Sequence, residues 1–283
     1  MIIDYASRPP VPAFSQATPH LATYDRVYEA SKGEALADVA GDLGAYLAMY
    51  ESVGARHVVV KARDLTTTFG FRISNEAVAE FCRQHAPRFI GFAGVDPHKG
   101  IAAVRELEHA VKELGLRGLN LQCFEHKLHI NDKKMYPLYA KCIELGVPVN
   151  IHTSINFSSA TLMDYGRPLL LDEVMVHFPE LRVCAAPPGF PWVHELIGVA
   201  WRHRNVHIGM VAVRPKYMTV SGSGYEPLLT YGNSVLQDRM IWGTSYPLVP
   251  VPEAVHDIEA LPLKDSVRRK WLHDNAARFL GLE

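Results

Sequence analysis

Residues 101–122 read IAAVRELEHAVKELGLRGLNLQ, which is one repeat of a pattern that runs through the chain. The first part carries apolar residues at helical spacing, namely Val104, Leu107, Val111 and Leu114. Gly115 is suited to end that helix. The turn Gly-Leu-Arg-Gly then leads into Gly118–Gln122, an apolar run typical of a strand covered on both faces. A helix joined to a buried strand by so short a turn indicates an α/β fold.

The same alternation predicts eight strands separated by helices. The expected strands are Ile2–Tyr5, His57–Lys61, Phe89–Ala93, Gly118–Gln122, Pro148–His152, Arg182–Ala185, Val206–Met210 and Met240–Gly243. The expected helices are Glu34–Ser52, Ser74–His85, Ile101–Leu114, Met135–Leu145, Pro168–His177, Pro191–Trp201 and Tyr225–Leu236. Two terminal pieces, Asp265–Leu272 and Asn275–Leu280, are expected to pack outside the barrel. The pattern predicts a (β/α)8 TIM barrel, formed by residues 1–283 as a single domain.

Loops that follow the strands are expected at the C-terminal mouth of the barrel, where barrel enzymes carry their sites. The longest is Tyr5–Lys32, which is rich in proline and aromatic residues. The segments Thr153–Arg167, Val211–Gly224 and Thr244–Glu253 are expected there as loops as well. Polar residues near strand ends are therefore the candidates for a functional site.

Composition argues against several classes of partner. The formal net charge of -1 provides no field that would gather nucleic acid or an anionic membrane. No apolar run approaches the roughly 18 residues of a membrane span. The four cysteines show no C-x-x-C spacing, and no secretory leader precedes them, so we expect a reducing cytoplasmic location.

Several motifs resemble those of one protein family. They are IIDYASRP at residues 2–9, FAGVDP at 92–97, LGLRGLNL at 114–121, FPELRV at 178–183, GFPW at 189–192, IWGTSYP at 241–247 and NAARFL at 275–280. Together they resemble the amidohydrolase-related branch of the amidohydrolase superfamily, which includes aminocarboxymuconate-semialdehyde decarboxylase-like proteins. The resemblance implies an amidohydrolase-like barrel and a metal-dependent decarboxylase or hydrolase of small organic acids.

The resemblance also implies where that family holds its metal, and most of those positions have changed here. Two first-strand histidines correspond to Ala6 and Arg8, the fifth-strand histidine is His152, and the eighth-strand aspartate corresponds to Ser245. The sixth-strand histidine, which often acts as acid or base, falls within Ala185–Pro187. Alanine and a protonated guanidinium cannot ligate a metal, and a catalytic zinc usually needs three protein ligands. We therefore expect a degenerate metal site, with no metal or other cofactor.

Other residues near the mouth provide an alternative set of metal ligands. They are Asp4, Cys123, Glu125, His126 and Cys184, with His126-x-x-His129 as a possible pair. We favour structural interpretations of these residues. Asp4 is expected to accept hydrogen bonds, the two cysteines to be core thiols, and both histidines to lie in a surface loop.

Four residues are candidates for a substrate site without metal. Arg8 occupies a family ligand position and can bind a carboxylate through two parallel hydrogen bonds, unless it lies at the surface of the first loop. His152 is expected to face the pocket as a hydrogen-bonding group or proton carrier, with a core histidine as the alternative. Asn120 and Ser245 would orient the substrate by hydrogen bonds.

Two functions of different classes follow. The first is a non-catalytic or accessory subunit, in a homo-oligomer or in a hetero-oligomer with a metal-bearing paralogue that acts on a small organic or amino acid. The alternative is a metal-independent decarboxylase or hydrolase of a small carboxylated or aromatic substrate, using Arg8 and His152. Decarboxylation suits such a site better, because it needs no metal-activated water. A binding protein for a small acid is a third possibility.

Overall fold

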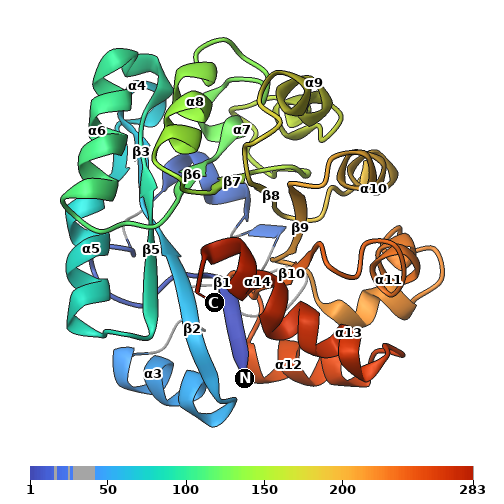
Figure 1. Ribbon diagram of the computed structural model, residues 1–283. Coiled ribbons are helices and arrows are strands. Elements are labelled where there is room, and N and C mark those ends of the chain that lie inside the picture. Colours follow the sequence, from blue (N-terminus) through green and yellow to red (C-terminus); the bar gives the residue numbers. More distant parts are fainter. Residues whose placement is uncertain (16–17, 25, 28–41, 283) are drawn as a thin grey trace.

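Eight parallel strands curve into a ring in the computed structural model, which describes residues 1–15, 18–24, 26–27 and 42–282 (Figure 1). In order around the ring they are β1 (Ile2–Ser7), β2 (Ala55–Lys61), β5 (Phe89–Gly94), β6 (Leu119–Leu121), β7 (Val149–Ile151), β8 (Val183–Ala185), β9 (Val206–Met210) and β10 (Met240–Trp242). The two ends of the sheet meet where Ser7 bridges Tyr246 and the Ser245 amide donates to the Ala6 carbonyl at 2.7 Å. The (β/α)8 barrel and the eight strands predicted from the sequence are confirmed.

Helices surround the ring and alternate with the strands. They are α3 (Leu43–Ser52), α5 (Asn75–Gln84), α6 (Ile101–Lys112), α8 (Tyr136–Glu144), α9 (Leu170–His177), α10 (Val193–Arg202), α11 (Glu226–Gly232), α12 (Val251–Ala260), α13 (Asp265–Arg269) and α14 (Asn275–Leu280). Ser74 caps α5 as predicted, since its hydroxyl accepts a hydrogen bond from the Ala77 amide at 3.1 Å. The first part of the helix expected at Glu34–Ser52 lies outside the described residues. None of the described helices has the length and apolar character needed to cross a bilayer.

Some elements were not predicted, and most of them are short. After β2 the chain forms a hairpin of β3 (Arg63–Leu65) and β4 (Phe71–Ile73) around the single turn α4 (Thr66–Phe69), and α7 (Cys123–His126) follows β6. The segment Thr244–Glu253 is not a loop throughout, because α12 begins at Val251. Elements of three or four residues carry almost no periodicity and depend on tertiary contacts for their stability.

The barrel interior is apolar at its N-terminal end. Ile3, Tyr5, Val59, Phe92, Cys184 and Ile241 form one buried cluster there, and α14 adds Ala276, Ala277, Phe279 and Leu280. The Phe279 ring stands edge-on to Tyr5 at 5.8 Å and to His207 at 4.9 Å. The helix α14 therefore closes the N-terminal end of the barrel and lies across the centre of the ring in Figure 1. The sequence prediction that Asn275–Leu280 packs outside the barrel is therefore wrong for the side of α14 that faces the barrel interior.

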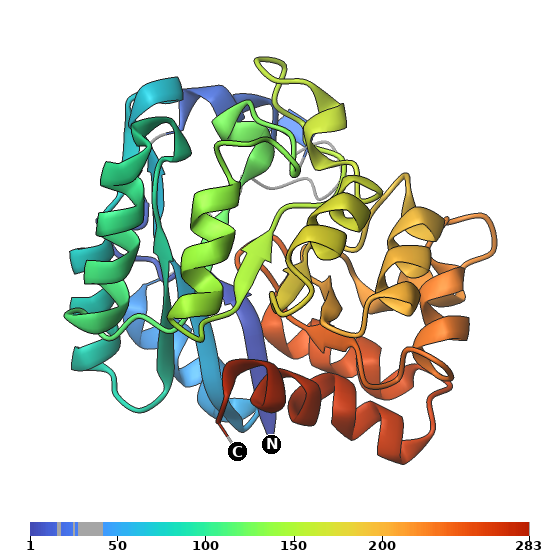
Figure 2. The ribbon, with the colours of Figure 1, turned by 45° about the horizontal axis from the view of Figure 1, so that its top comes forward.

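Segments that follow the strands cover the opposite, C-terminal end. The loop after β1 contains a short 3-10 turn, Pro19–Leu21, which contacts two other mouth segments. His20 donates to Glu125 of α7, and its carbonyl accepts from the Ser158 hydroxyl at 2.8 Å. The prediction that Tyr5–Lys32 lies over the mouth is thus confirmed for its described part. In Figure 2 these segments lie at the top, and both chain ends lie at the bottom.

Candidate active site

A layer of polar side chains lies inside the barrel, immediately above the apolar cluster. Alternate residues of a strand point to the same face, so Lys61 follows Val59 into the interior. Its ammonium donates to Asn150 Oδ1 at 3.1 Å, and Asn150 Nδ2 donates to Asn120 Oδ1 at 2.9 Å. Asn120 Nδ2 in turn donates to the Ala62 carbonyl at 3.0 Å. Because a carbonyl can only accept, this last bond determines the orientation of both amides and presents an oxygen to Lys61.

The Lys61 amine has neutral contacts, and the charged groups that act on it electrostatically are Asp4 and Arg63. It lies 4.4 Å from the centre of the Tyr5 ring and interacts electrostatically with the Cys184 thiol. Burial is the main cause that lowers the pKa of Lys61 to about 8, although the side chain keeps partial exposure. Within the described part of the chain it forms no ion pair. At pH 7 roughly a tenth of this lysine is therefore a free amine.

His152 directly follows β7 and lies on the same face as Asn150, one step nearer the mouth. It is only 6% exposed, and burial lowers its pKa to about 4, so the imidazole is neutral at pH 7. Its ring lies 4.6 Å from Phe124. Its Nδ1 has no hydrogen-bond partner among the described residues. This nitrogen packs against Gly166, because a Cβ built on Gly166 would lie 3.2 Å from it. This leaves Nε2 as the ring nitrogen that can exchange a proton with a ligand.

A second charged group stands beside His152. Glu125 Oε1 accepts from Arg63 at 3.2 Å and from His20 at 3.0 Å, while Oε2 has no partner among the described residues. Burial raises the pKa of Glu125, but Arg63 and His20 outweigh it and hold that pKa below its ordinary value. Arg63 and Glu125 both act electrostatically on His152. The mouth therefore joins a neutral imidazole, a carboxylate that accepts from Arg63 and His20, and the Lys61 amine one step deeper.

The four residues predicted for the substrate site have different environments. His152 lies at the mouth, as just described. The Asn120 amide is occupied by Ala62, Asn150 and Gln122, so it holds other side chains in place. The Ser245 amide donates to the Ala6 carbonyl, which brings together two positions that the sequence resemblance assigned to metal ligands. Arg8 is partly exposed, and its amide donates to the Tyr246 carbonyl at 3.0 Å.

The residues considered for a rebuilt metal site do not come together as one. The Asp4 carboxylate accepts from Ala6, from Tyr50 and twice from Thr244, at 2.6–3.0 Å, which is the structural role predicted for it. Cys123 and Cys184 are core thiols, as predicted, and burial raises the pKa of each to about 12. Among the described residues, no three His, Cys, Asp or Glu side chains form a group that could hold a metal ion.

One of the histidine predictions is wrong. His126 is 2% exposed rather than part of a surface loop, because α7 folds back into the mouth. Burial lowers the pKa of His126 to about 4. His129 has 42% of its side chain exposed, as predicted. At the positions that the sequence resemblance assigned to metal ligands, Ala6 and Arg8 offer no lone pair, Ser245 offers a neutral hydroxyl and His152 offers an imidazole. The loss of the family's metal stays a prediction.

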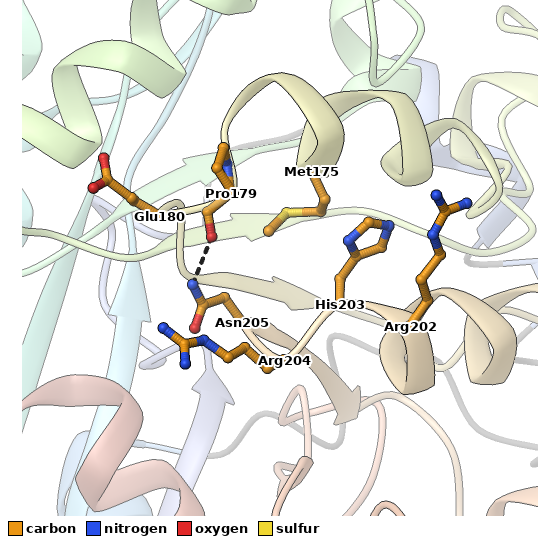
Figure 3. A pocket seen from close by; sticks show the side chains of 7 residues that line it. All are labelled: Met175, Pro179, Glu180, Arg202, His203, Arg204 and Asn205. Carbon is orange, nitrogen blue, oxygen red and sulfur yellow. Dashed lines mark hydrogen bonds between the residues drawn. The ribbon is translucent and has the colours of Figure 1, made fainter.

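A surface cavity of about 300 Å³ lies elsewhere on the molecule (Figure 3). Its lining residues are Met175, Pro179, Glu180, Arg202, His203, Arg204 and Asn205. Pro179 and Glu180 precede β8, and Asn205 precedes β9, so the cavity borders the N-terminal ends of the strands. Arg202 and His203 are paired with Asp172. The cavity thus lies at the N-terminal end of the barrel, opposite the end that carries Lys61 and His152. In barrel enzymes the active site lies at the C-terminal end, and the N-terminal end contributes to stability.

Comparison with known proteins identifies the family. The model of a family described as amidohydrolase matches residues 20–282, so the chain belongs to that family. The 2-amino-3-carboxymuconate-6-semialdehyde decarboxylase of Dictyostelium discoideum is 23% identical over 236 residues, which cover 74% of this chain and 66% of that protein. The gamma-resorcylate decarboxylase of Rhodococcus jostii (strain RHA1) is 23% identical over 251 residues, covering 75% of this chain and 76% of that protein.

Solved structures give the same fold. An uncharacterized TIM-barrel protein from Bordetella bronchiseptica is 28% identical, with a TM-score of 0.84 over 99% of this chain and 98% of that one. The 2,6-dihydroxybenzoate decarboxylase from Rhizobium is 17% identical, with a TM-score of 0.70 and the same two coverages. The second likeness concerns the fold alone.

Proposed function

We propose that this member of the amidohydrolase family decarboxylates a small carboxylated substrate at the barrel mouth, without a bound metal. The observation that carries the proposal is the set of groups found there. The partly exposed Lys61 amine, which forms no ion pair among the described residues, and the neutral His152 imidazole both lie inside the barrel towards its mouth. The names of the curated relatives, all decarboxylases of carboxylated compounds, support the same reaction class.

The reaction needs three contributions. The substrate carboxylate has to be bound, the electron pair left on carbon has to be stabilised, and that carbon has to receive a proton. No water has to be activated as a nucleophile, which is the step that most needs a metal near pH 7. Of the two reactions considered, the mouth therefore supports decarboxylation better than hydrolysis.

The charges at the mouth match these contributions. Lys61, when protonated, carries a positive charge that forms no ion pair among the described residues, and an anionic substrate would stabilise it, because burial of a charge without such a pair is unfavourable. That charge is also placed to stabilise negative charge that develops on the substrate. His152 exchanges a proton at Nε2, and a bound anion would raise its pKa towards the working range. We assign the anchoring role to Lys61 together with Arg8, the residue expected from the sequence.

The accessory-subunit function rests only on the changed ligand positions. The relatives' names favour the decarboxylase alternative over it, since they describe active enzymes. Oligomeric state, whether homo-oligomeric or with a metal-bearing paralogue, and cytoplasmic location remain predictions. Size-exclusion chromatography with light scattering on the protein purified from its own organism checks the first of these.

The test is a carbon dioxide release assay combined with elemental analysis. The panel contains 2,6-dihydroxybenzoate, other carboxylated aromatics and small keto acids, each with and without a chelator. We expect turnover that persists in chelator and falls by about two orders of magnitude or more in His152→Ala, while the exposed His129→Ala control stays at the wild-type rate. Turnover that disappears in chelator and returns on addition of manganese or zinc would refute the metal-independent mechanism. Absence of release across the panel would refute decarboxylation.

A further inference from the structure

We propose that Lys61 is a covalent nucleophile, which forms an imine with the carbonyl group of a small β-keto acid. The inference rests on the proposed function for the decarboxylation step, but imine formation itself does not depend on it. It identifies the electron sink that the reaction requires. A protonated imine adjacent to the carboxylate-bearing carbon accepts the electron pair that is left when carbon dioxide departs.

The contacts of Lys61 distinguish it from other lysines of the chain. Lys99 and Lys141 pair with carboxylates, and such pairing keeps an ammonium charged. Lys61 contacts an amide oxygen, an aromatic ring and a protonated thiol, and it forms no ion pair within the described residues. Asn150 Oδ1 and the Tyr5 ring favour the charged form, as do Cys184 and Asp4 electrostatically, but burial and Arg63 outweigh them and lower the pKa of Lys61. A lysine held in this way is the kind that proteins use as a nucleophile.

The geometry also orients the amine. Asn150 Oδ1 accepts one N–H of Lys61, and that oxygen is held in place through Asn120 and the Ala62 carbonyl. A neutral amine donating this bond keeps its lone pair available for a carbonyl carbon. The side chain is partly exposed and follows Val59 of the apolar cluster towards the mouth, which is the side from which the proposal has the ligand approach.

Groups nearer the mouth suit the rest of such a substrate. Arg63 is a permanent cation whose side chain is 19% exposed, and it already binds one carboxylate, that of Glu125. His152 lies on the same strand face as Asn150, one step further out. A β-keto acid with its carbonyl at Lys61 would direct its carboxylate towards Arg63.

The step balances as follows. The amine attacks the carbonyl carbon, and the carbinolamine loses water to give a protonated imine. The bond between the α-carbon and the carboxylate then breaks, carbon dioxide leaves, and the electron pair moves through the α-carbon to the imine nitrogen, which forms an enamine. The α-carbon takes a proton from His152 Nε2 or from water. Addition of water to the resulting imine releases the ketone and restores the amine, so that one proton is consumed for each carbon dioxide released.

The experiment is reductive trapping on the full chain. The protein is incubated with acetoacetate, treated with sodium borohydride, digested and mapped by mass spectrometry. We expect a reduced adduct concentrated on the peptide that carries Lys61. Lys61→Arg keeps the charge but cannot form an imine and should lose that adduct, whereas Lys141→Arg, which replaces an ion-paired lysine, should keep it. Labelling spread evenly over surface lysines, or absent from Lys61, overturns the proposal; this readout on the wild-type protein holds even if a variant fails to fold.

Carbon dioxide release measured in parallel separates this inference from the proposed function. Trapping at Lys61 without release from any acid supports the imine site and contradicts decarboxylation. Release from an acid of the panel at an equal rate in wild type and in Lys61→Arg supports decarboxylation and overturns the imine. Release from acetoacetate that is lost in Lys61→Arg together with the adduct supports both.

Discussion

Replacing Lys61 by methionine tests the environment of this amine through the pH dependence of stability. Burial lowers the pKa of Lys61 from its ordinary 10.5 to about 8 in the folded protein. Between these two pH values the unfolded chain binds more protons than the folded chain, so the free energy of unfolding of the wild type rises with pH. Below pH 8 both states are protonated, and the folded protein carries the full cost of the buried charge.

The magnitude follows from the size of the shift. A difference of about 2.5 pKa units corresponds to roughly 3 kcal/mol at 1.36 kcal/mol per unit. Partial exposure of the side chain screens part of it, so we expect about 2 kcal/mol. Lys61→Met removes the titrating group but leaves Asn150 Oδ1 without its partner, at a cost of about 1–3 kcal/mol that does not vary with pH.

The assay is urea unfolding of both proteins at several pH values from 7 to 10. The wild type should gain about 2 kcal/mol relative to Lys61→Met over this range, because all other titrating groups contribute equally to both. Lys141→Met, which removes a lysine paired with Glu144, serves as the control and should not reproduce the trend. A wild-type-to-Met difference that stays constant with pH would show that Lys61 is solvated like a surface lysine, and the nucleophile argument would fail with it.

Three further changes test other parts of the structure. Phe279→Ala should lower the free energy of unfolding by about 3–5 kcal/mol in denaturant titration, because it empties the N-terminal end of the barrel, whereas the part-exposed Phe157→Ala should cost much less. Burial lowers the pKa of His152 to about 4 in the folded protein, so as the pH falls from 6.5 to 4 the unfolded chain binds more protons and the free energy of unfolding decreases. In urea titrations, His152→Asn should lose about 3 kcal/mol less of this free energy than the wild type over that range. Equal losses in the two proteins would contradict a buried neutral imidazole. Thr244→Val removes a 2.6 Å hydrogen bond to the buried Asp4 carboxylate and should destabilise the protein by about 1–3 kcal/mol, measured by thermal unfolding; no change would mean that this carboxylate is satisfied without it.

The sequence alone determined the features that depend on local spacing. Apolar runs and helical stripes predicted all eight strands and most helices, and Ser74 could be identified as a cap because an N-cap involves residues only three apart. His152 was found through its motif. A signal for Lys61 was also present, since a lysine ends the otherwise apolar run Val58–Val60, but nothing local showed which side of the strand it would face or what it would meet.

Tertiary structure decided the remainder, because those features join residues far apart in the chain. Lys61 meets Asn150 only when β2 and β7 share one barrel interior, and Asp4 is satisfied by Thr244 across the seam between β1 and β10. His126 is buried because α7 folds into the mouth, against the polar appearance of its segment. Short elements and long-range polar contacts gain their stability from packing and desolvation, and neither quantity can be read from the order of residues along one segment.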